Sequence, residues 1–196
     1  MTSTLPTIQR ALLPLMWAAW ALYWWITSTN VKATARREPI LSRWAHLGPM
    51  AIAAWLLLAP QVALPGLDAR FLAEAAAPVA FAIGATLTAA GLLFAVWARR
   101  HIGRNWSATV TLKEGHELVT SGPYALVRHP IYTGLLLAFM GSGFARGDLG
   151  GVVAVVLVLA ALWRKLRMEE RWMCEQFGEA YLAYRRRVAA LVPFLL

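Results

Sequence analysis

The long apolar runs of this chain constrain its fold more than any other feature, because a helix needs about 20 mostly apolar residues to cross a bilayer. The longest run extends from about Phe71 to Ala98, and four others cover residues 11–26, 46–64, 131–144 and 149–163. Charged residues make up only 15% of the sequence, whereas they make up about 25% of a soluble domain. The sequence therefore predicts an all-α integral membrane protein with about five transmembrane helices.

Basic residues flank these runs in a pattern that predicts their orientation. They gather after the first run, after the third run at Arg99 and Arg100, and beyond the fifth run from Arg164 onward. The positive-inside rule puts all three segments on the cytoplasmic side if the N-terminus is outside and the C-terminus is cytoplasmic. The first run has no small-residue cleavage site, so we expect a permanent span and not a signal peptide. The net charge of +9 then comes from basic residues that set the orientation of the helices and contact anionic lipid headgroups. No nucleic-acid partner is expected.

The distribution of polar residues divides the chain into two parts. Residues 1–102 form N-terminal transmembrane helices, and small residues at Gly84, Thr88 and Gly91 predict close helix packing there. Residues 103–196 hold a long polar loop, a helical hairpin broken at residues 145–148, and an amphipathic tail. The lone cysteine, Cys174, excludes an intramolecular disulfide. The histidines at positions 101, 116 and 129 lack the spacing of zinc ligands, so no metal site is expected.

A polar motif stands at the start of the fourth run and consists of Arg128-His129-Pro130-Ile131-Tyr132-Thr133-Gly134. Pro130 suits the first turn of a helix, where its missing N–H costs nothing. His129 then lies at the mouth of the helix, with Tyr132 on the same face. The free N–H groups of a helix N-terminus suit a carboxylate. The alternative interpretation is an interfacial cluster in which Arg128 and Tyr132 are anchors and His129 is solvated.

Two adjacent glutamates, Glu169 and Glu170, lie in the charged tail helix. Apolar residues from Leu162 onward recur at helical spacing, and either glutamate can complete that stripe. A carboxylate that faces a packed or membrane-proximal surface is costly without a cationic partner. That partner is either structural, such as Arg128, or the cation of a ligand.

A third motif follows in the amphipathic segment 177–193, which contains Phe177-Gly178, Tyr181, Tyr184, Arg187-Val188 and Pro193. Taken together with the segments 103–107, 118–124 and 127–134 and the Glu169-Glu170 pair, it resembles the isoprenylcysteine carboxyl methyltransferase family. These membrane-embedded methyltransferases use S-adenosylmethionine and are related to phospholipid methyltransferases. The resemblance covers about half of the chain, roughly from Gly103 to Pro193, in both order and spacing.

The resemblance implies that residues 103–196 are the catalytic region, with a cytosol-facing loop and tail that enclose S-adenosylmethionine. The implied cofactor-binding residues are His116, Glu117, Leu118, Val119, Tyr124, His129, Pro130, Ile131, Tyr132, Glu169 and Glu170. Glu169 is favoured over Glu170 as the partner of the cofactor's ammonium group. The implied catalytic residues are Arg128, His129, Tyr132 and Glu169. Arg128 and Lys165 are the candidates to bind a carboxylate, either of the cofactor or of the substrate.

The implied reaction transfers a methyl group to the carboxylate of a lipidic or prenylated acceptor, which enters sideways from the bilayer. Such a carboxylate is already ionised, so the site needs positioning and exclusion of water but no general base. One alternative is a phospholipid or lipid-amine N-methyltransferase, which would need a base such as His129. Another is a non-enzymatic membrane transporter or scaffold. Transporters usually place ionisable residues at mid-membrane depth, and the runs of this chain are almost free of charge.

Overall fold

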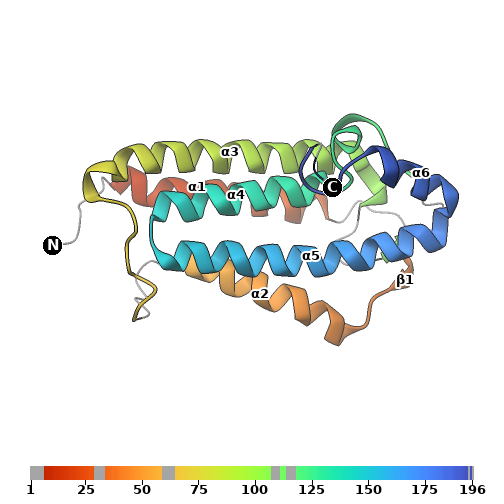
Figure 1. Cartoon of the computed structure of the whole chain (residues 1–196), viewed down its shortest axis with the longest axis horizontal. Coiled ribbons are helices and arrows are strands. Elements are labelled where there is room, and N and C mark those ends of the chain that lie inside the picture. The colour runs from red at the N-terminus through yellow and green to blue at the C-terminus, as the bar shows by residue number, and fades with distance from the viewer. Residues whose placement is uncertain are drawn as a thin grey trace.

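The structure is a computed structural model that describes residues 7–28, 34–58, 65–106, 111–113, 118–193 and 195. Its long helices are α1 (Thr7–Thr27), α2 (Ile40–Leu58), α3 (Ala77–Ile102), α4 (Pro130–Arg146) and α5 (Leu149–Phe177). The shorter elements are α6 (Glu179–Arg187), the 3-10 helices η1 (Glu74–Ala76), η2 (Gly103–Asn105) and η3 (Gly122–Ala125), and the strands β1 (Thr34–Arg37) and β2 (Thr111–Lys113). The long helices lie side by side along the long axis, with α2 at one edge against α5 (Figure 1).

The helical class predicted from the sequence is confirmed, with one addition. β1 and β2 pair as an antiparallel two-stranded sheet, which joins the α1–α2 connection to the polar loop after α3. The apolar pattern could not reveal this sheet, because both strands lie in polar loops. α2 begins at Ile40 and not near His46 as expected. Pro39 directly precedes that start and suits the beginning of a helix.

α3 and α4 pack backbone against backbone at two pairs of glycines. A Cβ atom on Gly84 would lie 2.4 Å from the carbonyl oxygen of Gly141, and one on Gly91 would lie 2.4 Å from that of Gly134. Between these two contacts the buried Thr88 hydroxyl donates to the Gly84 carbonyl oxygen at 2.8 Å. The close helix packing predicted from small residues in the third run is therefore confirmed.

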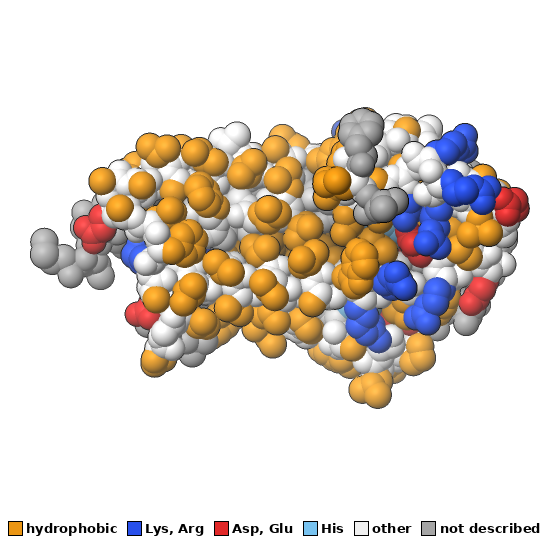
Figure 2. Space-filling view, in the orientation of Figure 1, with side chains coloured by type: hydrophobic (Ala, Val, Ile, Leu, Met, Phe, Trp, Pro, Cys, Tyr) orange, Lys and Arg blue, Asp and Glu red, His pale blue; other side chains and the backbone are white. Residues whose placement is uncertain are grey.

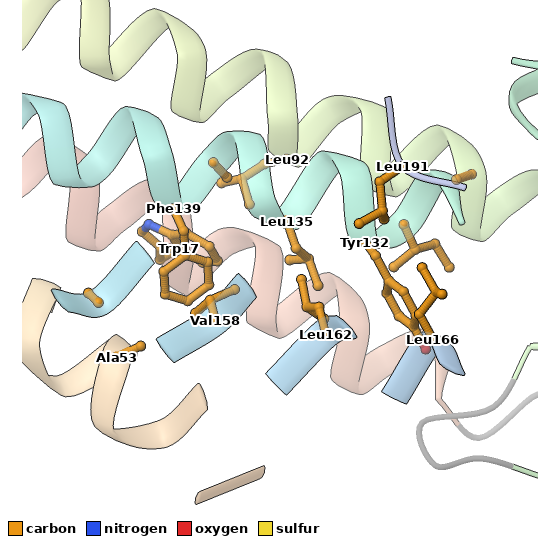
Figure 3. Packing of buried hydrophobic residues seen from close by; sticks show 14 of the residues in the cluster. Trp17, Ala53, Leu92, Tyr132, Leu135, Phe139, Val158, Leu162, Leu166 and Leu191 are labelled. Carbon is orange, nitrogen blue, oxygen red and sulfur yellow. The ribbon is translucent and has the colours of Figure 1, made fainter. Parts of the chain in front are cut away.

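The apolar core lies where α1, α4 and α5 meet (Figure 3). The rings of Trp17 and Phe139 have centroids 4.7 Å apart, and the Trp17 Nε1 donates to the Ser142 hydroxyl at 3.0 Å. Leu162 is almost fully buried in the same cluster, which continues along α4 to Tyr132 (Figure 3). The core thus reaches directly to the N-terminus of α4, where the first polar motif begins.

The predicted hairpin of the fourth and fifth runs is present as α4 and α5. Gly147 adopts the left-handed conformation that ends α4, and the Asp148 carboxylate caps α5 by accepting from the Gly151 N–H at 2.9 Å. α3 begins at Ala77, later than the expected start near Phe71. The Phe71 N–H instead donates to the Gly147 carbonyl oxygen at 3.1 Å, which ties this segment to the hairpin turn.

Within the described part of the chain, two helical stretches are long and apolar enough to cross a membrane, Glu74–Asn105 and Leu149–Phe177, and Ala11–Thr27 forms a shorter apolar helix. α5 has 29 residues. At about 1.5 Å per residue it is longer than the roughly 30 Å of bilayer hydrocarbon. Its charged C-terminal part, which carries Glu169 and Glu170, therefore extends beyond an apolar layer that covers its first part.

Candidate active site

One end of the helical bundle brings together the motifs that are separate in the sequence. The N-terminus of α4 and the C-terminal part of α5 lie there, with η3 before α4 and α6 after α5 (Figure 1). Lys and Arg side chains concentrate on the surface of this end, whereas the rest of this face is mostly apolar (Figure 2). The arrangement places the charged segments of residues 118–191 around one cluster of buried polar side chains.

Arg128 and Glu170 form a buried ion pair in this cluster. The guanidinium Nε and Nη2 lie 2.8 and 2.7 Å from Glu170 Oε1, and both side chains are less than 10% exposed. The remaining nitrogen, Nη1, donates to the backbone carbonyl oxygens of Arg185 and Val188. The Arg185 side chain approaches the other Glu170 oxygen at 3.7 Å. Arg128 therefore joins α5, α6 and the segment after α6.

Glu169 has a different environment from its neighbour. Its Oε1 accepts from the Tyr132 hydroxyl at 2.5 Å, and its Oε2 lies 3.6 Å from the Nδ1 of His129. The rings of His129 and Tyr132 are stacked, with centroids 5.4 Å apart and an angle of 5° between their planes. The Glu169 side chain is 24% exposed, against 8% for Glu170. Glu169 is thus the more accessible carboxylate of the pair, and Arg128 is paired with the other one.

Lys165 lies one turn before Glu169 on α5 and is buried. Its Nζ stands 5.3 Å from the ring centre of Tyr132, within the range of a cation–π contact. An ammonium group and a carboxylate therefore lie against the same tyrosine. Such an arrangement can hold a ligand that carries both a positive and a negative charge, or two ligands of opposite charge.

The segment after α6 covers the N-terminus of α4. The N–H groups of Arg128 and His129 donate to the carbonyl oxygens of Ala189 and Ala190 at 2.8 and 3.0 Å. The Thr133 hydroxyl donates to the carbonyl oxygen of Leu191 at 2.6 Å. These bonds join the first motif to the segment after α6, and each segment satisfies backbone hydrogen-bonding groups of the other.

Tyrosines from η3 and α6 complete the cluster. The Tyr184 hydroxyl donates to the backbone carbonyl oxygen of Tyr124 at 2.5 Å, and both side chains are buried. Burial raises the pKa of the Tyr184 hydroxyl to about 12 and also raises the pKa values of Tyr124 and Tyr181. All three hydroxyls are therefore uncharged at neutral pH.

Sequence reasoning missed the part played by His101. Its Nε2 lies 2.9 Å from the Ser121 hydroxyl oxygen, which holds the loop before η3 against the end of α3. A Cβ atom on Gly122, which has a φ of 59°, would lie 2.6 Å from the same imidazole ring. The Ser121-Gly122-Pro123 turn was a visible signal, but nothing in the sequence linked it to His101.

The other predicted cofactor residues divide into two sets. Tyr124, Pro130 and Ile131 are buried, and Leu118 and Val119 are half-buried. Tyr124, Ile131 and Val119 belong to the same apolar cluster as Tyr132, so the structure brings them together. His116 and Glu117 lie outside the described residues. Among the residues that the structure describes, no group of three His, Cys, Asp or Glu side chains could hold a metal ion.

Known proteins resemble the part of this chain that forms the cluster of buried polar side chains. A family model described as phospholipid methyltransferase matches residues 79–180, which extend from α3 into α6. The cobalt-zinc-cadmium resistance protein CzcN of Cupriavidus metallidurans is 35% identical over 96 residues, which cover 48% of this chain and 44% of that protein.

Two further relatives carry an enzyme name. The protein-S-isoprenylcysteine O-methyltransferase of Schizosaccharomyces pombe is 33% identical over 99 residues, covering 47% of this chain and 41% of that protein. The enzyme of the same name from Rattus norvegicus is 34% identical over 119 residues, which cover 56% of this chain and 42% of that protein. The chain thus spans less than half of the length of these relatives. The resemblance inferred from the motifs is confirmed by these matches.

A solved structure of the eukaryotic intramembrane Ras methyltransferase ICMT aligns with a TM-score of 0.43 and 22% identity, covering 79% of this chain and 51% of that one. The family model covers more than half of the chain and includes Arg128, His129, Tyr132 and the two glutamates. This protein therefore belongs to the phospholipid methyltransferase family.

Proposed function

We propose that this protein is an S-adenosylmethionine-dependent methyltransferase that methylates the carboxylate of a lipidic acceptor. Family membership supports methyl transfer, and the names of two relatives, both O-methyltransferases, support transfer to an oxygen. The observation that carries the proposal is the position of Lys165 and Glu169 against one buried tyrosine, Tyr132. This pair offers a cation for the acceptor's carboxylate next to an anion for the cofactor's positive charge.

The residues at the end of α5 fit S-adenosylmethionine. This cofactor, when bound, supplies an electrophilic methyl group on a sulfonium and also carries an ammonium group. Arg128 neutralises Glu170, whereas Glu169 contacts the Tyr132 hydroxyl and the His129 ring. Glu169 is therefore the carboxylate that receives the ammonium group, in agreement with the preference drawn from the sequence. Glu170 contributes by holding Arg128.

The apolar part of the cofactor site comes from the two segments on either side of the first motif. Tyr124, Pro130 and Ile131 supply buried surface around the N-terminus of α4, and Leu118 and Val119 lie half-buried before it. His116 and Glu117 are proposed as further cofactor-binding residues on the family resemblance alone.

Lys165 orients the acceptor's carboxylate. An ionised carboxylate attacks without losing a proton, so Lys165 acts by fixing the direction of attack and by offsetting the charge of the nucleophile. Arg128 uses its guanidinium nitrogens on Glu170 and on backbone carbonyl groups. We therefore assign Arg128 a positioning role at the meeting point of α5 and α6, and Lys165 the direct contact with the acceptor. His129 and Tyr132 hold Glu169 in place from α4.

The protein acts as a multi-pass membrane enzyme. We propose that α1 to α5 all cross the bilayer with the N-terminus outside. Residues 103–196 then form the catalytic region, whose site at the N-terminus of α4 and the C-terminal part of α5 faces the cytoplasm. The two stretches that are long and apolar enough to span support this arrangement, and so do the basic residues near the site (Figure 2). A lipidic or prenylated acceptor then enters from the bilayer, with its head group at the end of α5.

A lipid amine is the second candidate acceptor, since the family model is described as phospholipid methyltransferase. An amine must lose a proton on methylation, and His129 lies within 3.6 Å of both glutamates. To separate the two candidates, purified protein is incubated with S-adenosylmethionine and either N-acetyl-S-farnesylcysteine or phosphatidylethanolamine in liposomes. Mass spectrometry of the products then locates the added methyl group. We expect a methylated farnesylcysteine, and methylation of the phospholipid alone would contradict a carboxylate acceptor.

A further inference from the structure

A second buried polar pair lies outside the network described above. Glu38, just before α2, and His46, within α2, have side chains with no solvent exposure, and Glu38 Oε1 lies 3.5 Å from His46 Nε2. Ionisable groups buried within an apolar bundle are costly and commonly mark a functional site. Neither residue lies in the part of the chain that the family model matches, residues 79–180. The pair therefore lies outside the part of the chain that carries the family resemblance.

The packing of α2 on α5 brings this pair close to the proposed acceptor contact. Ser42 lies one turn before His46 on α2, and its hydroxyl oxygen stands 3.1 Å from Arg164 Nη2 and 3.8 Å from the sulfur of Met168. Residues four apart share a helix face, so His46 also faces α5. The charged groups that act on His46 are Glu38, Lys165, Arg164 and Glu169. His46 therefore lies beside the α5 segment that carries the ammonium group of Lys165.

The imidazole of His46 has an unused hydrogen-bonding atom. Among the residues that the structure describes, neither Nδ1 nor Nε2 has a hydrogen-bond partner although the ring is fully buried, and Nε2 has the Glu38 carboxylate at 3.5 Å. A neutral imidazole carries one N–H and one acceptor nitrogen. The Glu38 carboxylate lies 3.5 Å from Nε2 and favours a proton on that nitrogen, which would leave Nδ1 as an acceptor. A buried acceptor without a donor costs free energy that a ligand donor would recover.

We propose that His46 is a specificity-determining residue whose Nδ1 accepts a hydrogen bond from the amide N–H of an acylated S-isoprenylcysteine acceptor. This inference rests on the proposed function. In such an acceptor the amide nitrogen is bonded to the carbon that bears the carboxylate, so a carboxylate on Lys165 brings the amide toward α2. Glu38 is the positioning residue that sets the tautomer of His46. A carboxylic acid that lacks the amide forms the same contact with Lys165 but not the one with His46.

The position of α2 gives the acceptor a route to this residue. α2 lies at the edge of the bundle and packs mainly on α5 (Figure 1). Its outer face carries exposed apolar side chains, among them Leu41, Trp44 and Trp55, that suit contact with lipid. The proposed acceptor would reach His46 between α2 and α5, which leaves the close packing of α3 on α4 unchanged.

The test compares two acceptors that differ in the amide, N-acetyl-S-farnesylcysteine and S-farnesyl-3-mercaptopropionate. Methyl ester formation is measured with wild-type protein, His46→Ala and His46→Asn. We expect His46→Ala to lower kcat/KM about 3- to 10-fold for the amide-bearing acceptor, the effect of one lost hydrogen bond, and to leave the other acceptor unchanged. His46→Asn keeps an acceptor oxygen near the position of Nδ1 and should restore most of the preference. Circular dichroism of each variant in detergent checks that its helices are intact.

The outcomes separate the two proposals. An equal loss for both acceptors in His46→Ala, or a wild-type enzyme indifferent to the amide, would overturn the role of His46 while leaving carboxyl methylation in place. Formation of no methyl ester from either acceptor by the wild-type protein would overturn the proposed function itself, and the assignment of His46 with it.

Discussion

At the scale of single residues, the two adjacent glutamates have opposite roles because their neighbours differ. Glu170 is bound by Arg128 and shielded from solvent, whereas Glu169 is bound by the hydroxyl of Tyr132 and is partly exposed. The sequence showed the pair but could not distinguish its members, since either could complete the apolar stripe. The decisive information is which glutamate meets the arginine from α4, and only the packing of α4 against α5 supplies it.

Exchange of each glutamate for glutamine tests this division. Glu169→Gln removes the anion proposed for the cofactor's ammonium group, so its affinity for S-adenosylmethionine should fall at least about 10-fold, as expected for a lost charged hydrogen bond. Glu170→Gln leaves the Arg128 charge buried, so it should lower the free energy of unfolding by on the order of 3 kcal/mol. Titration calorimetry and thermal unfolding in detergent measure the two effects. The assignment is wrong if Glu169→Gln binds the cofactor as wild type does.

Because the Tyr184 hydroxyl has a raised pKa, we expect the free energy of unfolding to fall at high pH. Its pKa is about 12 in the folded protein, against about 10 in an unfolded chain. The unfolded state therefore loses a proton that the folded state keeps, so the stability is complete below about pH 10 and falls as the pH rises toward about 12. Tyr184→Phe should reduce this dependence. Unfolding curves at several alkaline pH values measure it, and identical slopes for the two proteins would exclude Tyr184 as the source.

At the scale of elements, the hydrophobic pattern predicted the helices better than their ends. The hairpin of α4 and α5 was foreseen because Gly147 and Asp148 interrupt two apolar runs. The start of α3 was placed too early, since the hydrogen bond that holds Phe71 extended comes from the distant hairpin turn. The β1–β2 pairing was missed for the same reason, because each strand needs its partner from another loop.

The contact between α3 and α4 gives a prediction at this scale. Gly91→Ala would place a Cβ atom 2.4 Å from a backbone oxygen of α4. The helices would have to separate, with a loss of about 1–3 kcal/mol in stability. Gly48→Ala is a matched control in α2, where an added Cβ meets nothing within 4 Å. It should be neutral or slightly stabilising, since alanine favours helix by about 1 kcal/mol over glycine. Equal melting temperatures for the two variants would contradict this account of the packing.

At the scale of the whole molecule, the chain forms an apolar bundle with one charged end, at the right of the view in Figure 2. The proposed orientation puts Asp68, between α2 and α3, outside the cell and Arg186, on α6, inside. Single cysteines at these positions, in a background with Cys174→Ser, can be labelled with a membrane-impermeant maleimide. Asp68→Cys should react in intact cells, and Arg186→Cys only after permeabilisation. Labelling of both positions in intact cells would put them on the same side of the membrane. That result would contradict the proposal that α3, α4 and α5, which lie between the two positions, all cross the bilayer.

The charged end was predictable from the sequence in outline, because its three motifs occur in the order and spacing of a known family. The contribution of α2 was not predictable, since Glu38 and His46 form no motif and belong to a helix at the other end of the sequence. The one available signal was a histidine at the edge of an apolar run. Only tertiary packing shows that this histidine faces the segment of α5 with Lys165.

The most direct test of the proposed function follows the labelled methyl group of S-adenosylmethionine. Purified protein in liposomes is supplied with N-acetyl-S-farnesylcysteine, and the product is then treated with base. A methyl ester releases its label as volatile methanol, whereas an N-methyl or S-methyl product retains it. We predict volatile label with the wild-type protein and almost none with Glu169→Gln. Label transferred in a base-stable form, or none transferred at all, would contradict carboxyl methylation by this protein.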